Sequence, residues 1–104
     1  MDRLFKVLFN NQGQVYEVYV RHVAHSDLAG FVEISEFVFG EKTQIVVDPA
    51  EERLKSEFSG VTRSLIPFHQ VIRIDQVEKS GTPGIQKETQ RPVTLLTLPN
   101  PPKS

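Results

Sequence analysis

Residues 48–77 read DPAEERLKSEFSGVTRSLIPFHQVIRIDQV, and this run constrains the architecture more than any other part of the chain. Its first half predicts one short helix over about 49–58. Asp48 is a favourable N-cap, Pro49 suits the first helical position, and Gly60 is a common stop just past a last turn. One apolar stripe recurs at helical spacing and should dock the helix on a sheet: Ala50, Leu54 and Phe58.

The second half of this run predicts two strands hinged at a proline. Residues 61–66 and 71–77 are rich in apolar and β-branched side chains, which favour strands. Pro67 cannot continue a central strand, and residues 68–70 (FHQ) predict a tight turn. The pattern is therefore strand, tight turn, strand.

The N-terminal part predicts a β-hairpin and two further strands. Apolar residues alternate over 4–9 and over 14–23, on either side of a turn with the sequence NNQG. Residues 31–39 and 43–47 predict two more strands. In the first of these, three phenylalanines alternate with the aliphatic side chains and should lie on the face opposite the core: Phe31, Phe37 and Phe39.

These elements predict one α+β domain, mainly β, over residues 1–78. Either a small, strongly bent antiparallel sheet or an SH3- or Sm-like barrel accommodates them together with one short helix. Residues 79–104 hold few apolar side chains before position 93, and four of the seven prolines fall from Pro92 on. This composition predicts a flexible, disordered C-terminal tail, interrupted by the short apolar run VTLLTL at 93–98.

Composition narrows the class of protein. The chain has 104 residues, a net charge of −1 and no cysteine, which excludes disulfides and thiolate metal sites. We expect a cytoplasmic protein, because no signal-peptide pattern and no run of roughly 20 apolar residues is present. Residues 1–78 carry 8 Lys and Arg against 12 Asp and Glu. Such an acidic body is unfavourable for a broad nucleic-acid platform.

Three segments resemble a family of short bacterial proteins known as a domain of unknown function, DUF1820. They read GQVYEVYVRHVAHSDLAGFVEI, FVFGEKTQIVVDPAEERLKSEFSGV and IPFHQVIRIDQVE. The resemblance extends over about residues 14–78 and leaves the last 26 residues outside it. It implies a bacterial, cytoplasmic protein and supplies no activity, cofactor or catalytic residue.

The candidate chemical groups favour a protein that is not an enzyme and holds no metal or cofactor. His22, His25 and His69 are the residue types of a metal site, but an HxxH pair at a strand end lacks the same-face spacing of a helical pair. The carboxylates that follow Asp48 lie at a helix start, where capping and the helix dipole account for them. The chain also contains no nucleophile elbow, P-loop or dinucleotide fingerprint.

The first hypothesis of function is a protein-binding or regulatory module, which contacts another protein through an apolar patch or an added strand. Its contact residues would be Phe37, Phe39, Val93, Leu95, Leu96 and Leu98. An exposed sheet edge would also permit a homo-oligomer. No membrane partner is expected.

The second hypothesis is an RNA-binding small β-barrel, in which bases stack on aromatic rings beside basic side chains. Its contact residues would be Tyr19, Arg21, Arg63, His69 and Arg73. The arginines also have a structural interpretation, as outward strand positions that pair with carboxylates: Glu17, Glu33 or Asp75.

Overall fold

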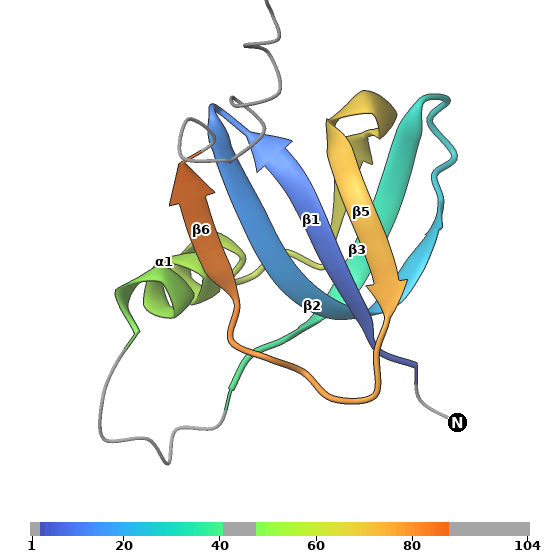
Figure 1. Cartoon of the computed structure of the whole chain (residues 1–104). Helices are drawn as coiled ribbons and strands as arrows, with labels where there is room; N and C mark the ends of the chain where they lie inside the picture. The colour runs from blue at the N-terminus through green and yellow to red at the C-terminus, as the bar shows by residue number, and fades with distance from the viewer. Residues whose placement is uncertain (1–2, 41–47, 88–104) are drawn as a thin grey trace, which may run out of the picture.

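A computed structural model describes residues 3–40 and 48–87 of the chain. This part forms a six-stranded antiparallel sheet and one α-helix (Figure 1). The elements in chain order are β1 (Phe5–Asn11), β2 (Gln14–His25), β3 (Phe31–Val38), α1 (Pro49–Glu57), β4 (Arg63–Pro67), the 3₁₀ turn η1 (Phe68–Gln70), β5 (Val71–Gln76) and β6 (Gly84–Lys87). The predicted mainly β class is confirmed, and the predicted strand at 43–47 lies outside the described residues.

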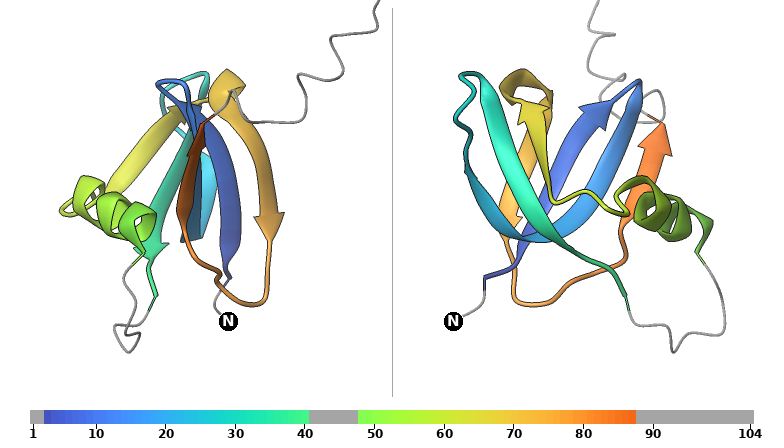
Figure 2. Two further views of the ribbon diagram at one scale, coloured as in Figure 1. Left: turned by 60° about the vertical axis from the view of Figure 1, so that its left-hand side comes forward. Right: turned by 180° about the vertical axis from the view of Figure 1, so that it is seen from behind.

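Strand β2 organises the sheet, whose order is β4-β3-β2-β1-β5, with β6 on β2 beside it. One edge of β2 pairs with β1, while the other pairs first with β6 and then with β3. The sheet bends strongly, so β3 and β4 lie across the core from β1 and β5 (Figure 2). The end strands β4 and β5 are joined by η1 but share no ladder among the described residues, which leaves the sheet open.

The β1–β2 hairpin closes through a two-residue turn. Gln12 has φ of 55° and Gly13 has φ of 79°. Positive φ at both central residues is the geometry of a type I′ turn, whose twist matches that of the flanking strands. The predicted hairpin is therefore confirmed.

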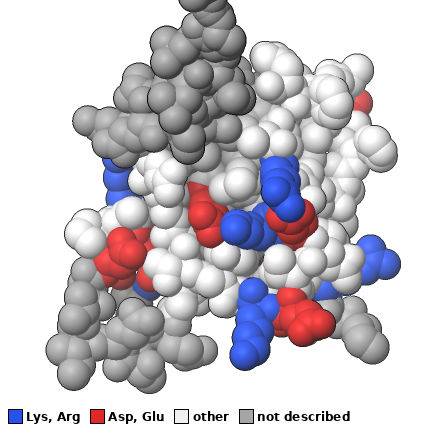
Figure 3. Space-filling model, viewed as in Figure 1, with Lys and Arg blue, Asp and Glu red and all other residues white. Residues whose placement is uncertain are grey.

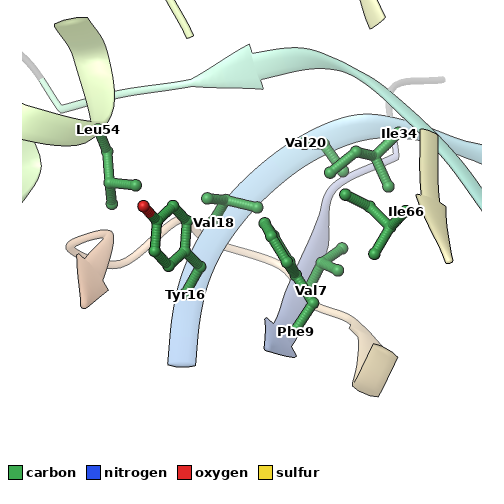
Figure 4. Close-up of a cluster of buried hydrophobic side chains, with 8 residues drawn as sticks. All are labelled: Val7, Phe9, Tyr16, Val18, Val20, Ile34, Leu54 and Ile66. Carbon is green, nitrogen blue, oxygen red and sulfur yellow. The ribbon is translucent and has the colours of Figure 1, made fainter. Parts of the chain in front are cut away.

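The core lies between the bent sheet and α1. Its buried members come from β1, β2, β3, β4 and the helix, and they converge in one cluster (Figure 4): Val7, Phe9, Tyr16, Val18, Val20, Ile34, Leu54 and Ile66. Leu54 is fully buried, as the predicted helix stripe requires. Since α1 has only nine residues, its stability comes from this docking. None of the helices in the described ranges is long and apolar enough to cross a bilayer.

Strand β3 changes faces at Glu36. Ile34 is in the core and Phe37 packs against it, although a strict two-residue alternation would place them on opposite faces. Glu36 has φ of 60°, in the left-handed region, and this turns the following residues toward the helix. Phe37 stacks on Phe58 with ring centroids 4.4 Å apart, and Phe39 stacks on Phe37 at 6.5 Å. The expectation that Phe37 and Phe39 lie opposite the core is therefore corrected.

The domain continues past the predicted boundary at residue 78. The Val77 amide donates to the Leu4 carbonyl at 2.8 Å, Pro83 is fully buried, and β6 extends the sheet beside β2. The predicted tail therefore does not begin at residue 79, because the folded structure continues to Lys87. The apolar run at 93–98 lies outside the described residues.

Candidate functional site

The two most exposed large apolar side chains of the described residues come from neighbouring loops. Phe68 is 69% exposed and Leu28 is 56% exposed. The Phe68 amide donates to the Gly30 carbonyl at 2.7 Å, and Phe31 pairs with Pro67 across β3 and β4. Because these contacts join η1 to the β2–β3 loop, both side chains lie at the same end of the molecule. We call this surface the apolar end and define it by Leu28, Phe31, Pro67 and Phe68.

The local sequence explains why these side chains face solvent. The Ser26 hydroxyl accepts from the Leu28 amide at 2.9 Å, and the Leu28 carbonyl accepts from the Phe31 amide at 3.3 Å. Gly30 completes the loop with φ of 87°, a conformation that glycine adopts without steric cost. The Leu28 and Phe31 amides are therefore satisfied within the loop, while the Leu28 side chain remains outside the core.

The surroundings of the apolar end resemble the anatomy of a protein interface. In Figure 3 the upper right of the molecule, over η1 and the start of β5, carries almost no charged side chains. His69 and Asp27 are exposed and lie next in sequence to Phe68 and Leu28. An apolar centre with polar residues at its rim is typical of surfaces that bind proteins.

Phe37 and Phe39, the contacts predicted within the domain, are half-buried and pack against the core cluster. The structure therefore gives them a packing role and leaves only part of each ring accessible. Val93, Leu95, Leu96 and Leu98 lie outside the described residues, so their role as a docking strand stays a prediction. Sequence reasoning missed Leu28 and Phe68, whose only signal was a large apolar side chain inside a turn.

The structure gives three of the residues predicted to contact RNA a burial or an ion pair of their own. Tyr19 is 6% exposed and offers no face on which a base can stack. Arg63 Nη1 lies 2.9 Å from Glu33 Oε1 on the β3–β4 pair. Arg73 Nε lies 3.0 Å from an Asp75 carboxylate oxygen on β5.

The interpretation of Arg63 and Arg73 as outward residues that pair with carboxylates is thus confirmed. Glu17, another carboxylate considered as a partner, lies 3.9 Å from Lys6 Nζ. Arg21 is exposed at the bend of β2, and His69 is exposed in η1.

The three histidines are distributed over β2 and η1. His22 Nε2 lies 3.9 Å from Glu33 Oε2, and His25 and His69 are exposed in different elements. Across residues 3–40 and 48–87, no three His, Asp or Glu side chains are close enough to share a metal ion. These residues therefore provide no three-ligand metal centre.

Two tyrosine hydroxyls bond to carboxylates. The Tyr16 hydroxyl donates to Glu57 Oε1 at 2.9 Å, and the Tyr19 hydroxyl donates to Glu17 Oε2 at 3.0 Å. Burial, followed by these hydrogen bonds, raises the pKa of both phenols above its ordinary value. Both phenols are therefore neutral hydrogen-bond donors at neutral pH.

A family model described as "Domain of unknown function (DUF1820)" matches residues 3–99. The chain belongs to the DUF1820 family. The match confirms the resemblance seen over residues 14–78 and extends it through β1, β6 and the 93–98 run. The comparisons with curated proteins and with solved structures gave no match. Because the DUF1820 description names no activity, a function for this chain has to be argued from its own geometry.

Proposed function

We propose that this DUF1820 protein is a non-enzymatic cytoplasmic binding module that docks another protein through its apolar end. The observation that carries the proposal is the exposure of Phe68 and Leu28 on two loops that are hydrogen-bonded to each other. Exposed apolar side chains that cluster mark interaction sites more often than scattered ones do.

The energetics of this surface fit a small hot spot. Burying a Phe or Leu side chain contributes about 1.5–3 kcal/mol relative to leaving it in water. Phe68 and Leu28 together would therefore supply a substantial part of a micromolar affinity, which corresponds to about 8 kcal/mol. The complementary partner is a protein with an apolar pocket that receives the Phe68 ring.

Affinity capture with matched variants tests the proposal. The tagged full-length chain and its Phe68→Ser and Val61→Ser variants are exposed to a bacterial lysate treated with RNase. Val61 is a suitable control because it is another exposed apolar residue, placed before β4 and outside the apolar end. We expect a defined protein to be captured by the wild-type and Val61→Ser chains and to be lost with Phe68→Ser.

Equal capture by the Phe68→Ser and Val61→Ser chains would overturn the proposal. Recovery of RNA in untreated lysate, with no protein left after RNase, would instead favour the RNA-binding alternative. Cell fractionation of the tagged chain tests the cytoplasmic location, for which the cysteine-free composition is the support.

A further inference from the structure

A hollow of about 800 Å³ lies where the start of β1, the bend of β2, the end of β3 and the connection after β5 meet. Its volume is in the range of small-molecule sites. Apolar side chains in its lining come from three of these segments: Leu4, Val38 and Val77. Basic side chains come from three segments as well: Arg3, Arg21 and Lys79.

Two basic side chains of this hollow, Arg3 and Lys79, differ from three other cations on the described surface. Lys6, Arg63 and Arg73 each lie within ion-pair distance of a carboxylate. Arg3 and Lys79, in contrast, make no hydrogen bond or ion pair with another described residue. Two cations that form no ion pair with a described carboxylate therefore line the same hollow, in a chain whose net charge is −1.

The connection that carries Lys79 is held against the sheet on both sides of it. Before Lys79, the Val77 amide donates to the Leu4 carbonyl at 2.8 Å. After it, the backbone of Gly81 hydrogen-bonds to the buried Tyr19 hydroxyl, and Pro83 is fully buried. Holding the backbone in this way limits the entropy that ordering the site on binding would cost.

We propose that this hollow binds a small organic anion, with a phosphate or carboxylate head between Arg3 and Lys79 and an apolar body on Leu4, Val38 and Val77. Arg and Lys side chains are the usual partners of such heads, and Arg presents two parallel donors to them. Glu78 lines the same hollow and opposes an anion electrostatically. This ligand site is separate from the protein-binding role of the apolar end.

Titration of the ¹⁵N-labelled full-length chain tests the site with three probes: inorganic phosphate, hexyl phosphate and hexanol. We expect hexyl phosphate to bind at least about tenfold more tightly than inorganic phosphate, because binding transfers several CH₂ groups of its hexyl chain out of water. The amide shifts should centre on Leu4, Val38 and residues 77–80. Hexanol should bind more weakly than hexyl phosphate, and the affinity should fall as salt rises. Hexanoate in a parallel titration distinguishes a carboxylate from a phosphate head.

Four exposed positions supply variants that leave the core intact. Arg3→Ala with Lys79→Ala should weaken hexyl phosphate binding about tenfold, because two charged contacts are lost. Glu78→Gln should strengthen binding, since it removes a negative charge from the lining. Arg73→Ala is the matched control: it also removes a cation, but outside the hollow, and should leave the affinity unchanged.

Several results would overturn the proposal. These are the absence of shifts with hexyl phosphate, shifts centred elsewhere, and equal losses in the Arg73→Ala and Arg3→Ala/Lys79→Ala chains. A fourth result combines two observations: hexyl phosphate does not bind, and the protein sediments with phosphatidylglycerol vesicles only when Arg3 and Lys79 are present. That result would assign the same cations to a lipid surface.

Discussion

At the scale of single residues, the backbone conformation of Glu36 determines which face of β3 Phe37 occupies. Its φ of 60° is uncommon for a residue with a side chain, and it places Phe37 on the helix side of the strand. Sequence alternation alone predicts the opposite face, because glutamate carries no signal for the left-handed region.

This strain leads to a stability prediction. A residue with a side chain costs roughly 1–2 kcal/mol in the left-handed region, whereas glycine does not pay this cost. We expect Glu36→Gly to have a free energy of unfolding about 1 kcal/mol higher than Glu36→Ala, as measured by urea denaturation. Both variants remove the same carboxylate, so the comparison isolates the backbone. A Glu36→Ala chain as stable as Glu36→Gly would contradict the observed conformation.

The tyrosine hydroxyls predict a pH dependence. The pKa of Tyr16 is raised in the folded protein by burial and by its bond to Glu57, while the unfolded value is about 10. Above about pH 10 the unfolded chain therefore loses this proton first, and the stability falls as pH rises. Below that pH the contribution is fully present.

We expect the free energy of unfolding to fall less steeply between about pH 9 and pH 11 in Tyr16→Phe than in the wild type. The decrease should be smaller still in Tyr16→Phe/Tyr19→Phe, because the pKa of Tyr19 is also raised. Parallel curves for all three chains, from denaturant unfolding at each pH, would be evidence against buried phenols.

At the scale of elements, α1 is the best-predicted part of the fold and β6 is the worst. The sequence marks α1 with a cap, a proline, an apolar stripe and a glycine, and the helix lies at Pro49–Glu57. Strand β6 is four residues long with one apolar side chain, Ile85, so its pattern is too short to distinguish from a tail. Its pairing with β2 is set by the tertiary fold.

The cap of α1 gives a prediction at this scale. Asp48 Oδ1 accepts from the Ala50 amide at 2.9 Å and from the Glu51 amide at 3.4 Å. We expect Asp48→Ala to lower the free energy of unfolding by about 1 kcal/mol, because these amides lose their acceptor. Asp48→Ser keeps an acceptor and should lose clearly less. If the two variants lost equal stability in thermal denaturation, the side-chain cap would not be the stabilising contact.

At the scale of the whole molecule, the connection from β5 to β6 covers the outer side of β2. A Cβ at Gly81 would lie 2.5 Å from the Tyr19 hydroxyl, whereas a Cβ at Gly84 would meet nothing within 4 Å. We therefore expect Gly81→Ala to be about 1 kcal/mol less stable than Gly84→Ala in urea denaturation, since the buried Tyr19 ring must shift. Equal stability of these two variants would show that the connection does not pack on Tyr19.

The candidate site at the apolar end could not be predicted from the sequence. Strand positions follow from local alternation, but the placement of Leu28 and Phe68 at the same end of the molecule depends on the pairing of Phe31 with Pro67, which are 36 positions apart. The exposure of these side chains also depends on how far the sheet bends. Local sequence patterns determine neither this long-range pairing nor the bend of the sheet. The sequence therefore indicated Phe37 and Phe39 as the contact residues instead.

The central claim is that the apolar end binds a protein. The most direct test is a map of amide chemical shifts in the ¹⁵N-labelled chain upon addition of the purified partner found by capture. The account predicts that the largest shifts fall on residues 27–31 and 67–70 and disappear with Phe68→Ser. Shifts that centre on the hollow around Arg3 and Lys79, or on the β1–β2 turn, would contradict it.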